Sequence, residues 1–350
     1  MNKFIEIDGR KIGKDYVPVI IAELGINHNG SLDIAKKIVD SAKEVGIEII
    51  KHQTHIPSEE MSDEAKKVIP GNSNNSIYSI MERCALTEEE EIELKRYVES
   101  KNMIFISTPF SFAAVDRLER MNVSAYKIGS GEMNNLPLVE YIAQKNKPII
   151  ISTGMNDIES VKKTVETVNK YHNNFAILHT TNLYPTPIHL VRLGALRELQ
   201  ECFPKEIIGL SDHTIDNYSS LAAISMGSSI IEKHFTDTKR RKGEDIICSM
   251  TPKQAKELIE FSNNFFIMNT GKKQPSAEEK ITIDFAFSTI VARKNINKGE
   301  IFTLDNLTTK RPNVKNGIEA SKLYDILGRK AKKDITLNSH LKLKDVDDEK

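Results

Sequence analysis

The sequence predicts an α/β protein, a (β/α)8 TIM barrel followed by a small β-rich domain. Short apolar runs recur between residues 19 and 236, and each is followed by an amphipathic stretch long enough for a helix. There are eight such runs, and most begin about 22 to 31 residues apart, the length of a strand, a helix and two loops. After Asn269 the composition changes and the repeat stops. Eight βα units that close on themselves form a (β/α)8 barrel.

The expected strands share a β-branched apolar stretch that turns polar at its C-terminal end, and they are residues 19–27, 46–54, 102–110, 124–132, 147–154, 175–182, 206–214 and 229–236. Helices are expected between them. Ser31 is a predicted cap for a helix over 31–42, and Thr87 precedes a run of glutamates that favours a helix start. Segments 157–171 and 251–266 have the same helical pattern.

One connection is much longer than the others. Residues 55–83 are rich in Pro, Ser, Asn and Gly, and they follow the second expected strand. Because the C-terminal ends of barrel strands surround the barrel mouth, this segment is predicted to form a lid or a wall of the active site.

The expected domain organisation has three parts. Residues 1–270 form the barrel, and residues 271–283 form a polar linker that contains proline. Residues 284–350 are expected to form the small β-rich domain, with strands near 288–292 and 300–303.

Composition excludes several classes of function. Lys plus Arg and Asp plus Glu each number 49, so no overall charge favours nucleic acid or an anionic membrane as a partner. No signal peptide or membrane span is evident, which predicts a cytoplasmic protein. The three cysteines are scattered without the spacing of metal ligands, and they are expected to be buried and unpaired.

Two histidines near the ends of neighbouring expected strands indicate a metal site. His213 follows the apolar run 206–210, and His234 follows the run 229–231. Adjacent parallel strands lie about 4.8 Å apart, so both imidazoles could bind one divalent ion. Each histidine alone is more often a hydrogen-bonded core residue.

Cationic and neutral donors gather at the other expected strand ends. Two lysines with three serines and an asparagine would suit a compact anion such as a phosphate ester, and these residues are Lys51, Lys127, Ser130, Ser152, Ser211 and Asn182. The alternative is that the lysines are buried ion-pair partners of Glu23 and Glu132. Glu23 itself is a candidate general base, or a partner in such a pair.

A series of motifs carries a resemblance to a known family. The motifs in the barrel are AELGINHNG (22–30), KHQTH (51–55), MSDEA (61–65), IPGN (69–72), STPFS (107–111), YKIGSGE (126–132), STGM (152–155), NLYPTP (182–187), GLSDHT (209–214) and EKHFT (232–236). Together they resemble the bacterial N-acetylneuraminate (sialic acid) synthases. NKGE (297–300), KRP (310–312) and LGRK (327–330) resemble the antifreeze-like SAF domain of the same enzymes.

This resemblance implies an enzyme that condenses phosphoenolpyruvate with N-acetylmannosamine to give N-acetylneuraminic acid and phosphate. It implies Mn²⁺, or another divalent ion such as Mg²⁺ or Co²⁺, held by His213 and His234. It also implies a homodimer in which each SAF domain covers the partner's barrel. Phosphoenolpyruvate is then expected at the lysine and serine positions, and the sugar at Gln53, Thr108, Glu132, Tyr184, Asp245 and Arg311.

Two alternatives remain open. The acceptor could be that of legionaminic or pseudaminic acid synthesis, with Gln53, Tyr184 and the segment 55–83 as the features that decide. A non-enzymatic carbohydrate- or ice-binding protein is the other alternative, and the ring of charged strand-end residues argues against it. Residues 243–245 read Gly-Glu-Asp where the resembled family usually has Gly-Pro-Asp.

Overall fold

The computed structural model describes residues 2–71 and 73–347. Outside the described residues lie Met1 in the predicted barrel, Asn72 in the predicted lid, and residues 348–350 in the predicted C-terminal domain. The chain divides into two compact units, Met1–Thr270 and Gly271–Lys350. Among the described residues, no helix combines the length and the apolar character needed to cross a membrane.

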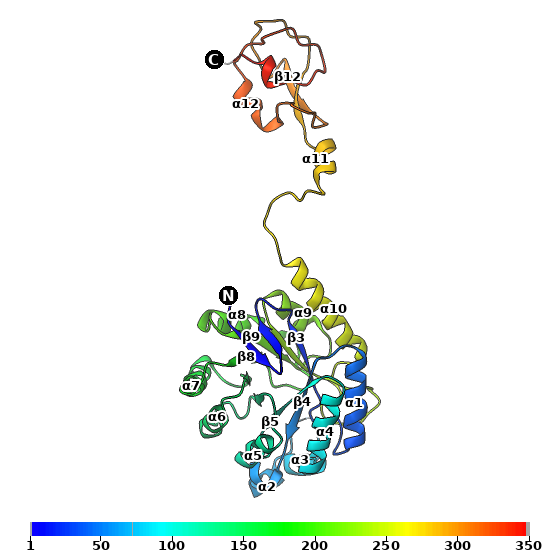
Figure 1. Ribbon diagram of the computed structural model, residues 1–350, viewed down its shortest axis with the longest axis vertical. Helices are drawn as coiled ribbons and strands as arrows, with labels where there is room; N and C mark the ends of the chain where they lie inside the picture. The colour runs from blue at the N-terminus through cyan, green and yellow to red at the C-terminus, as the bar shows by residue number, and fades with distance from the viewer. Residues whose placement is uncertain (1, 72, 348–350) are drawn as a thin grey trace. The chain divides into compact units, whose positions relative to one another are not determined.

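The first unit is a closed barrel of eight parallel strands, as the sequence predicts (Figure 1). Its strands, in the order in which they lie around the ring, are β3 (Val19–Glu23), β4 (Ile49–Thr54), β5 (Ile104–Pro109), β6 (Tyr126–Ile128), β7 (Ile149–Ser152), β8 (Phe175–Thr180), β9 (Ile207–Asp212) and β10 (Ile230–His234). Each lies inside one of the eight predicted runs. β10 pairs with β3 and closes the barrel.

Helices surround the barrel strands (Figure 1). They are α1 (Leu32–Glu44), α4 (Glu88–Ser100), α5 (Phe112–Arg120), α6 (Leu136–Ala143), α7 (Ile158–Asn169), α8 (Leu193–Cys202), α9 (Tyr218–Ser225) and α10 (Pro252–Met268), with the short 3-10 helix η2 (Ile188–Leu190) before α8. Ser31 caps α1 and Thr87 forms a capping box at α4, which confirms both predicted helix starts.

A hairpin at the N-terminus was not predicted. β1 (Phe4–Ile7) and β2 (Arg10–Gly13) pair antiparallel, with a turn in which Asp8 and Gly9 have positive φ. The side chains of Ile5, Ile7 and Ile12 are buried in one apolar cluster with residues from the first halves of the barrel strands. The hairpin therefore closes the N-terminal end of the barrel, which leaves the C-terminal end for ligands.

The long connection after β4 contains more regular structure than its composition indicates. It holds α2 (Pro57–Glu60), the 3-10 helix η1 (Asp63–Lys67) and α3 (Ile77–Cys84). Ser76 caps α3, and Ile80 packs against Ile26, just beyond β3. This contact attaches the segment to the strand ends.

The second unit has its own apolar core, in which Ile290, Phe302 and Leu341 are fully buried. Its elements are α11 (Lys280–Ala286), β11 (Thr289–Ala292), β12 (Leu307–Lys310), η3 (Ala320–Lys322), α12 (Leu323–Ile326) and η4 (Leu343–Asp345). β11 confirms the predicted run 288–292. The run 300–303 is not a strand and forms only an isolated bridge through Ile301, and the end of the predicted linker belongs to α11.

Candidate active site

A cavity of about 220 Å³ opens at the C-terminal ends of the barrel strands. Every one of the eight strands contributes at least one residue to its lining. The predicted site residues that line it are Glu23, Lys51, Gln53, Thr108, Lys127, Ser130, Glu132, Ser152, Asn182, Tyr184, Ser211, His213 and His234. Side chains that are distant in the sequence thus meet in one buried, polar space.

Two buried lysines and two buried glutamates form a network in this cavity. Lys51 Nζ lies 2.5 Å from Glu23 Oε2 and 3.9 Å from Glu232 Oε1. Lys127 Nζ lies 3.4 Å from Glu232 Oε1. The strand register explains the first contact, because β3 and β4 place Glu23 beside Lys51. The alternative that the two lysines pair with Glu23 and Glu132 is confirmed for Lys51 and Glu23, and it is wrong for Lys127, which contacts Glu232.

Glu232 is a site residue that the sequence analysis missed. It precedes His234 by two positions on β10, so both side chains point into the barrel. The Ser211 hydroxyl donates a hydrogen bond of 3.1 Å to Glu232. The two-residue spacing that places Ser211 and His213 on one face of their strand applies equally to Glu232 and His234. A glutamate within a strand also fits an edge strand that exposes its side chains to solvent, so the sequence alone did not single it out.

The network sets the ionisation of its members. Burial raises the pKa of Glu23, and the nearby Lys51 only partly offsets this. Burial also acts to raise the pKa of Glu232, but the combined attraction of Lys127 and Lys51 lowers it. Glu232 is therefore the carboxylate that stays ionised, whereas Glu23 has the greater tendency to accept a proton.

Hydrogen-bond donors surround the lysines. Lys127 Nζ donates to Ser152 Oγ at 2.7 Å, and Ser130 Oγ accepts the backbone N–H of Gly154 at 3.0 Å. The amide oxygen of Asn182 is buried without a hydrogen-bond partner. A Cβ at position 154 would lie 1.9 Å from that oxygen, so a larger residue there would force the Asn182 side chain to move.

The two predicted metal ligands do lie on neighbouring strands. Their imidazole centroids are 5.5 Å apart, with His213 just beyond β9 and His234 at the end of β10. His213 Nδ1 lies 2.9 Å from the carbonyl oxygen of Thr181 and donates to it, which leaves the Nε2 lone pair free. Burial lowers the pKa of His213 to about 4 and that of His234 well below its usual range. Both rings are therefore neutral, as metal binding requires.

The donor set fits a divalent ion that keeps several positions open. His234 Nδ1 is buried with no hydrogen-bond partner. A Cβ on Gly25 would lie 3.0 Å from that nitrogen and 3.3 Å from Glu23 Oε1, so the imidazole and the carboxylate lie close together. Among the described residues, no group of three or more His, Cys, Asp and Glu side chains is arranged to hold a metal. The chain itself therefore offers two imidazoles.

A second buried ion pair holds β9 and β10 together behind the histidines. Lys233 Nζ lies 2.8 Å from Asp212 Oδ2, and both side chains are almost fully buried. Asp212 also accepts hydrogen bonds from Ser219 and Ser220, at 2.8 and 2.7 Å. Because strand side chains alternate, this pair lies on the outer face and fixes the strands that carry His213 and His234.

Replacing Lys233 by methionine is expected to lower the free energy of unfolding by about 3 to 5 kcal/mol, because it leaves Asp212 charged and buried without its cation. Urea unfolding followed by circular dichroism measures the loss. The control is Lys162→Met, which breaks an exposed ion pair with Glu159 and should cost less than about 1 kcal/mol. Equal losses in both variants would show that the buried pair has no special role.

Comparison with known proteins identifies the family of the chain. Residues 38–274 match the NeuB family. This is more than half of the chain, and it contains most of the cavity residues. The chain belongs to the NeuB family. Residues 288–347 match the SAF domain, which agrees with the resemblance seen in the second unit.

Several NeuB relatives align along nearly the whole chain. The N,N'-diacetyllegionaminic acid synthase of Campylobacter jejuni is 37% identical over 323 residues, covering 90% of this chain and 96% of the relative. The human N-acetylneuraminate-9-phosphate synthase is 31% identical over 329 residues, covering 92% and 90%. The crystal structure of the N-acetylneuraminic acid synthetase of Leptospira borgpetersenii has a TM-score of 0.73 and 28% identity, covering 81% of this chain and 96% of that one.

Two predicted sugar contacts lie outside the strand-end cavity of this NeuB chain. Asp245 lines an adjoining cavity, and burial with the charge of Glu23 raises its pKa to about 7. Arg311 belongs to the second unit, where its side chain is exposed. Its guanidinium has no hydrogen bond or ion pair with any described residue.

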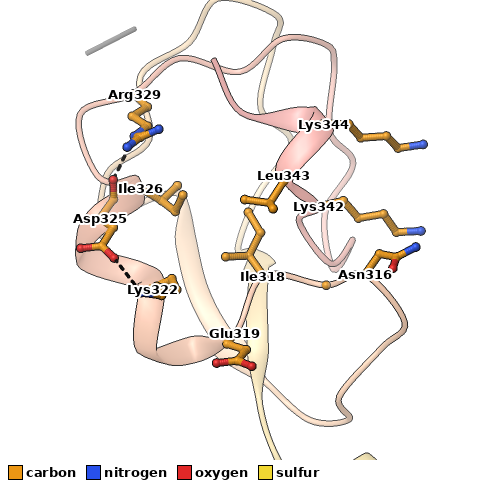
Figure 2. A pocket seen from close by; sticks show the side chains of 11 residues that line it. Asn316, Ile318, Glu319, Lys322, Asp325, Ile326, Arg329, Lys342, Leu343 and Lys344 are labelled. Atoms are coloured by element: carbon orange, nitrogen blue, oxygen red, sulfur yellow. Dashed lines mark hydrogen bonds and ion pairs between the residues drawn. The ribbon is translucent and has the colours of Figure 1, made fainter. Parts of the chain in front are cut away.

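The second unit has a larger hollow of its own, about 790 Å³ (Figure 2). Its floor is apolar, with Ile318 and Ile326, and its rim carries both signs of charge. Asp325 forms an ion pair with Lys322, and its backbone carbonyl accepts a hydrogen bond from Arg329. None of the predicted site residues lines it. The strand-end cavity therefore remains the candidate active site.

Proposed function

We propose that this NeuB-family chain condenses phosphoenolpyruvate with an N-acetylated hexose to give a nonulosonic acid and phosphate. N-acetylmannosamine, which would give N-acetylneuraminic acid, is the acceptor that the sequence motifs favour. The observation that carries the proposal is the meeting of two lysines, two neutral histidines and Glu23 in one barrel mouth. The lysines suit an anionic donor, the histidines suit a metal ion that polarises a carbonyl group, and Glu23 can accept a proton.

Phosphoenolpyruvate would bind between Lys51 and Lys127, with Ser130, Ser152 and Asn182 as further partners. The donors that surround the lysines are already oriented by the barrel. In the absence of ligand, however, each lysine faces a glutamate, so the four charges balance. A multiply charged anion therefore needs further positive charge in the cavity.

A divalent ion would supply that charge, and we propose Mn²⁺, or Mg²⁺ or Co²⁺, held by His213 and His234. When bound, such an ion acts as a Lewis acid that polarises the acceptor aldehyde. The chain's own contribution is to hold both imidazoles neutral and to fix His213 through the Thr181 carbonyl.

Glu23 has the properties of the base for water attack. The methylene carbon of phosphoenolpyruvate forms a bond with the aldehyde carbon as the carbonyl π bond breaks, and the aldehyde oxygen takes a proton from solvent to become a hydroxyl. The former enol carbon becomes an oxocarbenium ion. Water adds to this carbon while Glu23, whose pKa burial raises, takes the proton. The tetrahedral intermediate then breaks its bond to the phosphate oxygen, and phosphate leaves toward the lysines.

The diacetamido hexose that yields N,N'-diacetyllegionaminic acid is a second candidate acceptor. The observation that favours it is the 37% identity with the Campylobacter jejuni synthase of that acid. The chemistry at the donor would be the same, so only the acceptor pocket distinguishes the two.

Phosphate release from phosphoenolpyruvate tests the proposed function. We expect release only when an acceptor sugar is present, its loss after chelation, and its return with Mn²⁺. Mass spectrometry of the product identifies the nonulosonic acid. If the chain binds sugar but releases no phosphate with any divalent metal ion, it is instead a carbohydrate-binding protein.

Lys51→Ala and Lys127→Ala should each weaken phosphoenolpyruvate binding by about 10-fold to 150-fold, because each removes a charge-assisted contact worth about 1.5 to 3 kcal/mol. Isothermal titration with phosphoenolpyruvate gives the dissociation constants. Lys95→Ala, on the outer helix α4, is the control and should bind normally. Unchanged binding in both cavity variants would place the phosphate site elsewhere.

We also propose a homodimer in which each SAF domain completes the partner's active site. α10 runs back along the barrel wall from the C-terminal ends of the strands, so the chain leaves the first unit on the side away from the cavity. A two-fold axis brings the module to the neighbouring mouth without crossing its own barrel. The guanidinium of Arg311, which makes no hydrogen bond or ion pair with the described residues, is the group expected to contact the sugar.

Mixing an Arg311→Ala chain with a His213→Ala chain tests this arrangement. Each homodimer should be inactive. Mixed dimers should regain one intact site, which joins the normal barrel of the first chain to the normal module of the second, and phosphate release should recover after subunit exchange. Confirmed exchange without recovery would show that the module acts on its own barrel.

A further inference from the structure

Gln53 lies where two cavities meet. It lines the strand-end cavity and also an adjoining cavity of about 290 Å³, whose lining includes Ile77 and Ile80 of the segment 55–83. Under the proposed function, the side-chain amide of Gln53 contacts the acceptor sugar. An amide offers a hydrogen-bond donor on one side and an acceptor on the other, so its orientation decides which atoms of the sugar it can bind.

The orientation of this amide is set by His55, two residues further along the chain. His55 Nε2 lies 3.1 Å from Gln53 Oε1. The amide oxygen is therefore turned toward the imidazole ring. The NH2 group of Gln53 makes no hydrogen bond with any described residue, so it is available to a ligand in the cavity.

Glu60 in turn holds His55. His55 Nδ1 lies 3.0 Å from both carboxylate oxygens of Glu60. Glu60 is the last residue of α2, and its backbone N–H donates to the carbonyl oxygen of Ile56 at 3.1 Å, so a single helical turn brings its side chain back to the ring. The side chains of His55 and Glu60 are 5% and 6% exposed, so water competes little for these contacts.

Both partners of the imidazole ring present oxygen atoms to it. A carboxylate oxygen and an amide oxygen only accept hydrogen bonds, so both ring nitrogens of His55 donate. The ring then carries a proton on each nitrogen, and the carboxylate of Glu60 balances its positive charge. The Phe110 ring stacks on it at a centroid distance of 4.2 Å and an interplanar angle of 15°, which favours a cation and fixes the plane of the imidazole.

These contacts form a chain from the segment 55–83 to the ligand. Glu60 lines neither cavity, and His55 lines only the adjoining one. We infer that His55 and Glu60 are positioning residues, which act through Gln53 and turn its NH2 group toward an oxygen atom of the acceptor. This inference rests on the proposed function. A neutral ring would offer Gln53 a lone pair, which would attract the NH2 group and turn the amide oxygen to the cavity instead.

Steady-state kinetics with the better of the two candidate acceptors tests the inference. His55→Phe keeps a ring that can stack on Phe110 but removes both N–H donors. It should raise KM for the acceptor by about 3-fold to 10-fold, the loss expected for one hydrogen bond, and leave KM for phosphoenolpyruvate unchanged. Glu60→Gln should act in the same way, because without the opposing charge the ring gives up its second proton.

Glu59→Gln is the matched control, because it makes the same change at the exposed neighbour on α2, which lines neither cavity. Both KM values should stay normal in this variant. An unchanged KM for the acceptor in His55→Phe and Glu60→Gln would overturn the inference. Equal rises in the two KM values would also overturn it, because they would show general damage to the site.

A double-mutant cycle with Gln53→Ala shows whether the two residues act through the amide. In the Gln53→Ala background, His55→Phe and Glu60→Gln should cause no further rise in KM for the acceptor. A further rise as large as in the wild-type background would show that they act by another route, contrary to the inference. Melting temperatures of the same variants, followed by circular dichroism, measure any loss of stability separately.

Nitrogen NMR of the full chain labelled with ¹⁵N-histidine gives an answer that does not depend on turnover. The signals of His55 are those that disappear in His55→Phe. Both ring nitrogens should have the chemical shifts of protonated nitrogen, and Glu60→Gln should convert one of them to unprotonated nitrogen. If no sugar supports phosphate release, the proposed function fails, and this spectrum still decides how the amide is oriented. A wild-type His55 ring with an unprotonated nitrogen would contradict the inference.

Discussion

His213→Ala and His234→Ala should each abolish phosphate release, and each should weaken Mn²⁺ binding until it can no longer be measured. The two imidazoles are the only ligands that the chain is proposed to supply, so loss of either leaves a single protein ligand. His234 makes no hydrogen bond through Nδ1, and His213 loses its hydrogen bond to Thr181 and its ring contact with Tyr184. The fold should therefore survive, with little change in melting temperature.

Calorimetric titration with Mn²⁺, together with circular dichroism, separates loss of metal from loss of structure. His179→Gln is the matched control, because His179 is also a buried barrel histidine but bonds the carbonyl of Val191 and does not line the cavity. That variant should bind Mn²⁺ normally. Chelator-sensitive turnover in either cavity variant would contradict the metal assignment.

Glu23→Gln should lower kcat by about 100-fold or more while Mn²⁺ and phosphoenolpyruvate still bind. Glutamine keeps the size of the side chain but cannot take the proton from the attacking water. The change also removes the charge that faces Lys51 at 2.5 Å, so that lysine becomes freer to meet an anion. KM for phosphoenolpyruvate should therefore not rise.

Steady-state kinetics with saturating acceptor measures both constants. Glu91→Gln provides a control for a buried glutamate outside the barrel, where the carboxylate pairs with Arg117 at 3.1 Å. That variant should lose stability but keep kcat. Near-normal kcat in Glu23→Gln would make Glu23 a partner in an ion pair and no more.

The sequence by itself determined the barrel and most of its cavity. Eight β-branched runs with amphipathic helices between them allow few other folds. Period-two alternation then fixed which residues at each strand end face inward, which is why Lys51 with Gln53, and Ser211 with His213, appear together in the cavity. Strong caps such as Ser31 and Thr87 located helix starts because their hydrogen bonds are local.

Contacts that depend on more than one element had to come from the tertiary structure. Glu232 became visible as the partner of Lys127 only through the relative placement of β6 and β10, which lie apart in the ring. The hairpin that closes the barrel and the wall formed by α3 also depend on packing between distant segments. A sequence pattern shows which way a side chain points from its own strand. It does not show what lies opposite, because that depends on how the barrel closes.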